Sequence, residues 1–450
     1  MQLKESHLKQ DFLRFMLASM AAQWVFALYT MVDGIFVAKG VSELALSAVN
    51  LASPYVNFLF SVSLLFAVGV STIAAMRMGQ GKFKEANQAF SQIMAVLVVI
   101  SLVLTLVVML WPDALAEFLG AGEGVKPYVV EYLVHVGPFS ICFLIVYSFE
   151  VLVKTDGHPR LALFAVSFGC ILNCVLDYLF VFPFSMGVGG AAFATGLSQL
   201  ALIFIYLTHF FSHRATLTFV RFSFDWNIFW RSVKIGIPSG LTEWSAGITT
   251  FLFNHAIMAC LGEVAIVSYT ILAYLNTIAV MSMAGIAQGA QPMISYYLGA
   301  GKKSACQQLL SYALLSGGVM SGIAIGFAFL GADWMVSLFI PLEKSTLYAE
   351  SVRVMKIFSL SFLFSGINII FAGYFTSVEA PVASFVISVG RGFFTLAAAL
   401  IVSIFLWGGE GIWWAASLSE LLCLAATFLF AWQHRKKEKV CHKDCHRLFP

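Results

Sequence analysis

The most restrictive feature of this 450-residue sequence is a series of long apolar stretches separated by short polar breaks. A helix that crosses a bilayer needs about 20 mainly apolar residues, and only helices and closed barrels pair every backbone group away from water. Hydrophobic residues make up 60% of the chain and charged residues 11%, against about 25% charged residues in an ordinary water-soluble domain. The sequence therefore predicts an all-α integral membrane protein.

Twelve stretches are long enough to cross a membrane, and Pro, Gly or charged residues mark their ends. The expected spans are residues 12–37, 46–76, 90–111, 127–153, 161–182, 190–211, 235–258, 266–296, 306–331, 347–377, 384–407 and 411–432. The first span follows a charged run and is not followed by a small-residue cleavage pattern, so we expect it to be kept and not removed as a signal peptide.

The distribution of basic residues predicts the orientation. With the N-terminus inside, most of the 26 Lys and Arg residues fall in cytoplasmic segments, and the opposite side keeps only Lys39, Lys126 and Lys344. This asymmetry fits an even number of spans with both termini in the cytoplasm of a cell whose plasma (inner) membrane holds the protein. The net charge of +3 then reflects membrane topology, and we expect no nucleic-acid partner.

The second half of the sequence repeats the first. SELALSAVNL (42–51) aligns with GEVAIVSYTI (262–271), and MGQGKFKEANQAFSQ (78–92) aligns with LGAGKKSACQQLLSY (298–312), without a gap between the two matches. GVGGAAFATGLSQ (187–199) aligns with GGEGIWWAASLSE (408–420) after a shift of one position. The chain is predicted to have an N-lobe (1–212), a cytoplasmic connector (213–234), a C-lobe (235–432) and a basic cytoplasmic tail (433–450).

Both G-x-G-K turns carry Lys and so belong on the cytoplasmic side, which makes the halves parallel six-helix repeats with a central cavity between the lobes. These glycines are expected to end a helix and reverse the chain, because the spacing is not that of a phosphate-binding loop. No HExxH or GxSxG pattern occurs, so we do not expect an enzyme. The aromatic and basic connector is expected to lie on the membrane surface or to be an ordinary solvated linker.

The cysteines do not indicate a cofactor. Six of the eight lie in or beside predicted spans, where Cys usually packs as a small apolar residue. The tail segment CHKDCH (441–446) has ligand types that suit zinc, although a disordered basic tail is the simpler interpretation. We expect no cofactor, and no metal other than Na⁺ at a cation site.

Polar residues within the spans predict that cation site. A charged residue in a span costs roughly 2.5–3.5 kcal/mol and usually faces the bundle interior. Asn173 and Asp177 are spaced i,i+4 and share one helix face, as do Tyr29 and Asp33, while Thr195 lies on the sixth span. If these faces converge, two coupled carboxylates and neighbouring oxygens can bind H⁺ or Na⁺. The alternative is that the acids only tie helices together.

Other polar residues in the spans leave two interpretations open. Glu150 precedes Lys154 by one turn, which fits either a structural ion pair or a transport role. Arg391 either pairs with a carboxylate or reaches the membrane surface.

Three residues are candidates for the substrate cavity. Glu243 follows Pro238, whose kink frees backbone carbonyls, and has no obvious local partner. Gln288 and Gln291 lie beside Pro292 and either contact substrate or satisfy a kinked helix.

Several runs, in order along the chain, resemble the multidrug and toxic compound extrusion (MATE) transporters, particularly the bacterial MepA-like and DinF-like branches. They are VDGIFVAKG, TDGHP, GVGGAAFATGLSQ and IAQGAQPMISYYLGAGK. The resemblance covers essentially all twelve spans and implies the MATE-type fold. It also implies cation-coupled antiport of organic, often cationic, drugs or toxic compounds by rocking of two lobes about the cavity.

The resemblance also implies roles for individual residues. Family members with an acidic first lobe hold the coupling ion with residues that read here as Asp33, Asn173, Asp177 and Thr195. Glu243 lies where some members carry a seventh-span acid. The acid that some branches carry on the tenth span is missing from SFLFSGINIIFAGYF, so the resemblance favours an ion site in the first lobe.

Two other functions remain as alternatives. A lipid-linked precursor flippase of the same superfold would need a basic cavity for pyrophosphate, and intramembrane Lys and Arg are few here. An uncoupled channel or membrane scaffold would not depend on an ion gradient. We expect a monomer whose partners are a small organic cation and membrane lipid.

Overall fold

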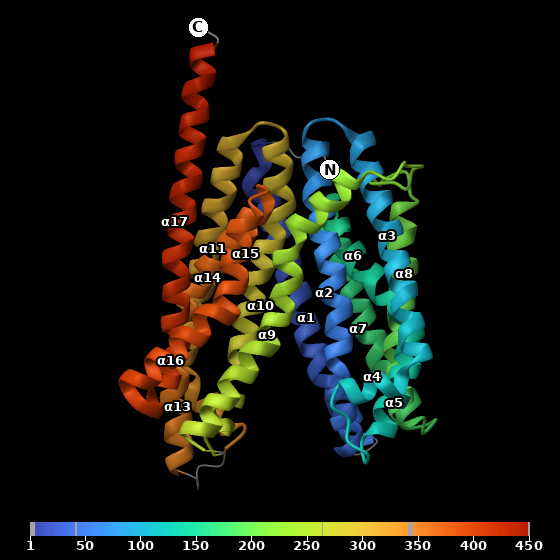
Figure 1. Ribbon diagram of the computed structural model, residues 1–450, viewed down its shortest axis with the longest axis vertical. Coiled ribbons are helices and arrows are strands. Elements are labelled where there is room, and N and C mark those ends of the chain that lie inside the picture. Colours follow the sequence, from blue (N-terminus) through green and yellow to red (C-terminus); the bar gives the residue numbers. More distant parts are fainter. Residues whose placement is uncertain (1–4, 41–42, 263, 341–344, 449–450) are drawn as a thin grey trace. The chain divides into compact units, whose positions relative to one another are not determined.

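The computed structural model describes residues 5–40, 43–262, 264–340 and 345–448, with the side chains of 30–40, 43–46, 246, 345 and 437–448 left out. Within these ranges every regular element is a helix (Figure 1). The predicted all-α membrane fold is confirmed.

The helices of the two halves follow one another in the same order. The first half contains η1 (Glu5–His7), α1 (Leu8–Gly40), α2 (Glu43–Gly79), α3 (Phe83–Leu110), α4 (Pro112–Phe118), α5 (Lys126–Val136), η2 (Gly137–Phe139), α6 (Ser140–Thr155), α7 (Pro159–Val181) and α8 (Gly187–Phe210). The second half contains α9 (Trp226–Cys260), α10 (Val264–Gly299), α11 (Lys303–Leu330), α12 (Ala332–Ser337), α13 (Ser345–Ser359), α14 (Phe362–Ser377), α15 (Pro381–Val389), η3 (Gly390–Phe394), α16 (Thr395–Trp407), η4 (Gly408–Glu410) and α17 (Gly411–Leu448). Even the short helices α4 and α12, which were not expected, begin at the same place in each repeat.

Each of the twelve expected spans falls on one of these helices or on consecutive ones. Among the described residues, nine helical stretches are long and apolar enough to cross a membrane, and the bent pair Thr346–Ser359 and Phe362–Ser377 adds a tenth. One of the nine, Pro381–Lys436, contains both the eleventh and the twelfth expected spans, and α9 covers the seventh. The structure is therefore consistent with twelve crossings.

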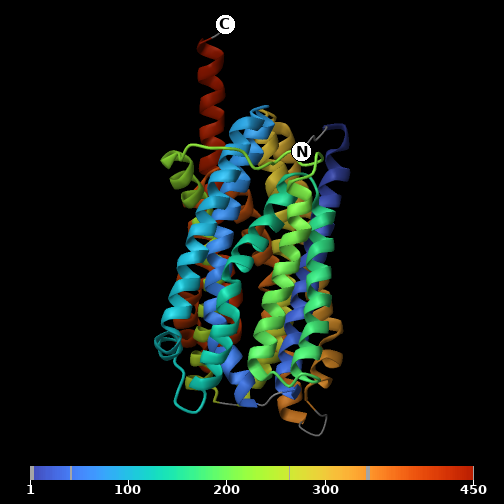
Figure 2. The same cartoon turned by 90° about the vertical axis from the view of Figure 1, so that its right-hand side faces the viewer.

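The helices form two compact units. The first comprises residues Met1–Trp244, Ala284–Tyr312 and Thr376–Glu379, and the second comprises Ser245–Met283, Ala313–Phe375 and Ala380–Pro450. In the first unit α7 packs against both α1 and α8, and α2 packs against α3 and α6, with these helices running lengthwise beside one another (Figure 2). In the second, α17 packs against α13, α15 and α16. Since the units share α9, α10 and α11, they are not the repeats themselves, and the lobe boundaries stay predictions.

Glycines let α2 and α10 cross closely in the first unit. A Cβ on Gly79 would overlap the carbonyl oxygen of Tyr296, and one on Gly299 would overlap the carbonyl oxygen of Met76. The repeat alignment places Gly79 opposite Gly299 and Met76 opposite Tyr296, so the two repeats meet through a pseudo-symmetric pair of contacts. Small residues allow such close approach of helix backbones.

The second glycine of each G-x-G-K turn ends its helix as predicted. Gly81 and Gly301 have φ angles of 76° and 74°, a conformation that Gly adopts without strain. The backbone N–H of Lys82 donates to the carbonyl oxygen of Arg77 at 2.8 Å, which closes the end of α2.

The connector is attached to the helices of the first unit. The helix α9 begins at Trp226, so the non-helical part is shorter than the predicted 213–234. Side chains of α3 bind its backbone: the N–H groups of Thr218, Val220 and Asp225 donate to Asn87 Oδ1, Ser91 Oγ and Gln92 Oε1 at 3.2, 2.9 and 3.0 Å. Leu217 is fully buried. The connector is therefore packed on the helices of the first unit and is not a loose linker, while its place at the membrane surface stays a prediction.

The C-terminal tail also differs from expectation. The backbone of α17 stays helical to Leu448, so the prediction of an irregular tail is wrong. Its Lys-rich and Glu-containing sequence favours continuation of the preceding helix. The side chains of the CHKDCH segment lie outside the described residues.

The glycine crossing predicts a specific pattern of stability. Gly79→Ala and Gly299→Ala should each lower stability by about 1–3 kcal/mol, because the added methyl group meets backbone that cannot rotate away. The measurement is the melting temperature in detergent by size-exclusion chromatography after heating. Gly318→Ala on α11 is the matched control, since its Cβ would meet open space. Equal melting temperatures for all three variants would contradict the role of the crossing.

Candidate functional site

The face of α7 that carries Asn173 and Asp177 is the buried one. The buried residues of this helix include Ala165, Gly169, Asn173, Asp177 and Val181, each one turn after the last. Asn173 is 2% exposed and Asp177 is fully buried. The i,i+4 face predicted from the sequence therefore points into the first unit and not toward lipid.

Asn173 links Asp177 to Thr195 on α8. Its amide group lies 2.7 Å from Asp177 Oδ2 on one side and 3.2 Å from Thr195 Oγ1 on the other. The hydroxyl of Thr195 also lies 3.0 Å from the carbonyl oxygen of Ala191, to which it can donate. The three side chains thus form one hydrogen-bonded network across α7 and α8.

This network fits two charge states of Asp177, because an amide can present either its oxygen or its nitrogen. When Asp177 is ionised, Asn173 Nδ2 donates to Oδ2, and Asn173 Oδ1 accepts from Thr195. When Asp177 is protonated, Oδ2–H donates to Asn173 Oδ1, Nδ2 donates to Thr195 Oγ1, and Thr195 donates to Ala191. A half-turn of one amide therefore accompanies the gain or loss of one positive charge.

The first helix lies beside the helix that carries Asp177. The helix α1 packs along α7, as convergence of the two faces requires. Tyr29 is half-buried, and its ring lies 6.1 Å from that of Phe26. The side chain of Asp33 lies outside the described residues, so its contact with Asp177 stays a prediction.

The oxygen of a second amide is also available on α8. Gln199 lies one turn after Thr195, and its Oε1 is buried with no hydrogen-bond partner among the described residues. Such an acceptor is a ligand type that suits a small cation.

Gln288 belongs to a polar cluster built around an ion pair. Glu150 Oε1 and Lys154 Nζ are 2.7 Å apart, with the side chains 14% and 4% exposed. Gln288 Oε1 accepts from Gln23 Nε2 at 3.2 Å and lies 3.5 Å from Lys154 Nζ. Of the two interpretations of Glu150, the structure shows the ion pair.

The other two cavity candidates have different surroundings. Gln291 is buried, and its Nε2 donates to Thr72 Oγ1 at 3.3 Å, so it ties α10 to α2. Glu243 is exposed on α9 and makes no ion pair or hydrogen bond with described residues. The structure does not bring either residue to the Asp177 network.

The second unit contains a buried ion pair of Arg391, one of the two interpretations left open by the sequence, whose partner Glu420 was not predicted. Arg391 donates to Glu420 Oε1 from Nε at 3.0 Å and from Nη2 at 2.7 Å, and the side chains are 15% and 12% exposed. Asn368 Nδ2 donates to Glu420 Oε2 at 2.7 Å, and Thr427 donates to Asn368 Oδ1 at 2.9 Å. The α14 part of the tenth expected span has no acid of its own, and its Asn368 binds an acid of the twelfth.

A usable signal for Glu420 was present in the repeat. The alignment of GLSQ (196–199) with SLSE (417–420) places Glu420 opposite Gln199, so the second half carries an acid where the first carries an amide. Arg391 lies in the single π-helical turn of the described chain, Gly390–Phe394, and such a turn is not visible in a hydrophobicity pattern.

The burial of the Arg391–Glu420 pair predicts that removing its carboxylate lowers stability more than removing a carboxylate from an exposed ion pair. Glu420→Gln should lower the free energy of unfolding by about 3–5 kcal/mol, because it leaves the guanidinium of Arg391 buried without a counter-charge. The exposed pair Arg353–Glu410 supplies the control: Glu410→Gln should cost less than about 1 kcal/mol. Melting temperatures of the two variants in detergent test this difference. Equal losses would show that the Arg391 pair is solvated.

Comparison with known proteins finds one family. A family model described as MatE matches residues 18–179 and 239–405, one segment in each repeat. The multidrug export protein MepA of Staphylococcus aureus (strain NCTC 8325 / PS 47) is 24% identical over 434 residues, which cover 95% of this chain and 94% of that protein. The MepA protein of Staphylococcus haemolyticus (strain JCSC1435) is 22% identical over 442 residues, 97% of this chain and 96% of that protein.

Solved structures show the same fold. An outward-facing multidrug resistance MATE family transporter of the MOP superfamily has a TM-score of 0.90 at 19% identity and covers 96% of this chain and 97% of its own. A MOP superfamily transporter from Pyrococcus furiosus, described as having a binding pocket of reverse polarity that suggests a different function, has a TM-score of 0.87 at 19% identity, with coverage of 96% and 98%. At this identity the likeness concerns the fold alone.

Proposed function

Because this chain belongs to the MatE family of membrane transporters, we propose that it exports organic, often cationic, compounds in exchange for H⁺ or Na⁺. The observation that carries the proposal is the Asn173–Asp177–Thr195 network inside the first unit. A buried carboxylate within an otherwise apolar helix is costly, and the amide of Asn173 beside it can serve either charge state.

Ion binding changes the contacts between helices. Protonation of Asp177 reverses the direction of the hydrogen bonds that join α7 to α8, and either H⁺ or Na⁺ offsets a buried negative charge. Transport follows if the ion and the substrate favour different conformations, because each then shifts the equilibrium against the other. Rocking of the two six-helix repeats is the motion that we propose, with substrate between them.

We also propose the location, the cavity character and the oligomeric state of the transporter. The distribution of basic segments supports a plasma-membrane protein with both termini in the cytoplasm. The 43 Phe and 16 Met residues suit a pliable apolar cavity for varied organic compounds. The protein acts as a monomer without a cofactor.

The flippase alternative is weaker than antiport. A site for pyrophosphate needs basic side chains that are free to bind it, and the charge of Arg391 is offset by Glu420. The channel alternative predicts solute movement that is independent of any ion gradient.

Removal of the carboxylate tests the network. Asp177→Asn should lower gradient-driven efflux by roughly 5- to 150-fold, the range of a lost coupling free energy of about 1–3 kcal/mol, while expression and folding persist. The measurement is efflux of a fluorescent organic cation from cells that produce equal amounts of each variant. Asp333→Asn, an acid of α12 outside this network, is the control and should transport normally. Normal efflux by Asp177→Asn would remove Asp177 from the mechanism.

Transport in reconstituted vesicles identifies the coupling ion and distinguishes antiport from an uncoupled channel. With the pH gradient and the Na⁺ gradient varied independently, one of them should drive accumulation of the organic cation against its own gradient. Substrate movement that is the same under both gradients and under neither would identify a channel.

A further inference from the structure

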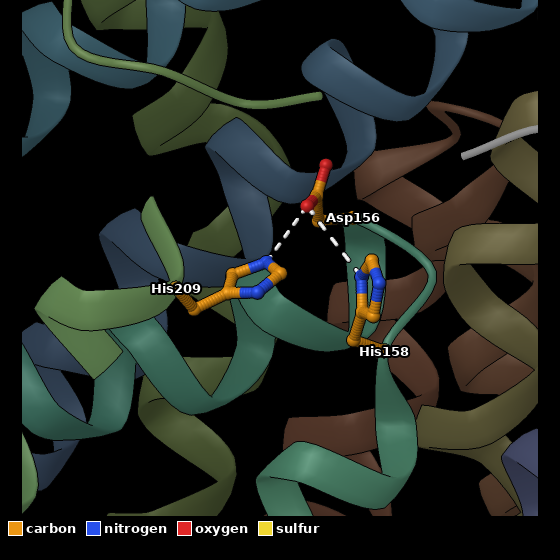
Figure 3. Close-up of side chains that lie close together, drawn as sticks. All are labelled: Asp156, His158 and His209. Carbon is orange, nitrogen blue, oxygen red and sulfur yellow. Dashed lines mark hydrogen bonds and ion pairs between the residues drawn. The ribbon is translucent and has the colours of Figure 1, made fainter. Parts of the chain in front are cut away.

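A cluster of three chelating side chains lies outside the Asp177 network. Asp156 and His158 belong to the turn between α6 and α7, and His209 belongs to the last turn of α8 (Figure 3). Gly157 has a φ angle of 96°, which lets the turn direct both of its neighbours toward His209. The three side chains point at one another in the close-up.

Asp156 fastens the connector with one oxygen and faces the histidines with the other. Its Oδ1 accepts from the backbone N–H groups of Thr216 and Leu217, both at 2.9 Å. Its Oδ2 lies 2.8 Å from His209 Nε2. Burial raises the pKa of Asp156, but the two imidazoles and the N–H of Leu217 lower that pKa to about 2.

The imidazole of His158 makes no hydrogen bond through Nδ1 to any described residue. Its Nδ1 lies 3.6 Å from Asp156 Oδ2, too far for a hydrogen bond, and this buried nitrogen has no other partner among the described residues. An unsatisfied buried polar atom destabilises the folded state. The rings of His158 and His209 lie edge to face with their centroids 4.6 Å apart. The turn therefore holds an imidazole nitrogen 3.6 Å from a carboxylate oxygen, within reach of an ion pair when the imidazole is protonated but without a hydrogen bond.

We propose that Asp156, His158 and His209 bind a divalent transition-metal ion of the zinc class. Zinc takes His nitrogen and carboxylate oxygen at about 2.0–2.2 Å, so neighbouring donors of a tetrahedral site lie roughly 3.4 Å apart. The donor separations here are 2.8 and 3.6 Å, and all three donor atoms lie within 4.8 Å of one another. Small side-chain shifts bring them to a common ion, with water as the fourth ligand. The proton of His209 Nε2 then moves to Nδ1.

Such an ion would clamp the connector. Asp156 Oδ1 keeps its hydrogen bonds to the connector while Oδ2 binds the metal. The backbone N–H groups of Thr216 and Leu217 therefore orient the carboxylate of Asp156 through the oxygen that does not bind the metal. The ion joins the α6–α7 turn to the end of α8, and through Asp156 to the segment that links the two repeats. This consequence does not depend on which compound the protein transports.

The second repeat fixes the corresponding turn by other means. TDGHP (155–159) aligns with SVEAP (377–381), which places Glu379 opposite Gly157, and Glu379 has a φ angle of 54°. It accepts from Arg231 of α9, with Nη2 2.7 Å and Nε 3.1 Å from Oε2. Both turns thus hold the chain between the repeats, one through an ion pair and the other through the Asp156 cluster. The histidines are particular to the first repeat.

The test is metal binding by the full-length protein in detergent. All proteins carry Cys441→Ser and Cys445→Ser, so that the tail does not supply thiolates. After removal of metal, Co²⁺ is added as a spectroscopic probe, and Zn²⁺ affinity is measured by its displacement. One tetrahedral Co²⁺ per chain is expected, with affinity reduced at least about tenfold in His158→Ala and in His209→Ala. His213→Ala, a connector histidine outside the cluster, is the matched control and should bind normally.

Thermal stability separates a metal site from a hydrogen-bonded anchor. Zn²⁺ should raise the melting temperature of the parent protein and of His213→Ala, but not that of His158→Ala, because only a ligand of the native state stabilises it. His158 makes no hydrogen bond through this nitrogen, so a purely structural cluster predicts no difference between these proteins. The inference is overturned if no Co²⁺ binds, or if binding survives His158→Ala and His209→Ala.

Discussion

A polar group inside an apolar helix has no water to bind, and the protein must supply its partner. This constraint decides which helices of the structure lie together. Asp177 is satisfied by Asn173 on its own helix and through it by Thr195 on α8. Arg391 is satisfied by Glu420 of α17, and Lys154 by Glu150 one turn away. Outside the spans the same rule explains the connector, whose backbone is bound by side chains of α3 and by Asp156.

The two repeats meet this constraint in different ways, and the difference bears on mechanism. In the second unit a side chain supplies the positive charge, because the guanidinium of Arg391 binds the carboxylate of Glu420. The described partners of Asp177 in the first unit are neutral, and an amide and a hydroxyl can turn to suit either charge state. A carboxylate that is paired with Arg already has a counter-charge and has no need of an exchangeable ion. This contrast supports an ion site in the first half of the chain.

Features that follow from the length and periodicity of apolar residues were predicted from the sequence. The spans followed from apolar length, and the buried face of α7 followed from the i,i+4 spacing of Gly169, Asn173 and Asp177. The sequence did not predict Glu420 as the partner of Arg391, because that pairing depends on a π-helical turn and on how α15 to α17 pack. The glycines of the G-x-G-K turns were understood as helix ends, while the crossing of α2 and α10 needed three-dimensional contacts. Connector docking was missed for the same reason, since its partners lie far away in the chain.

The central claim is that Asp177 gives up a small cation when substrate binds, and the most direct measurement is of that cation. Purified protein in weakly buffered detergent solution is mixed with a saturating organic cation, while a pH dye reports H⁺ and a radioactive tracer reports Na⁺. The account predicts release of about one ion per chain from the parent protein and none from Asp177→Asn. Equal release from both proteins, or substrate binding without release from either, would contradict it.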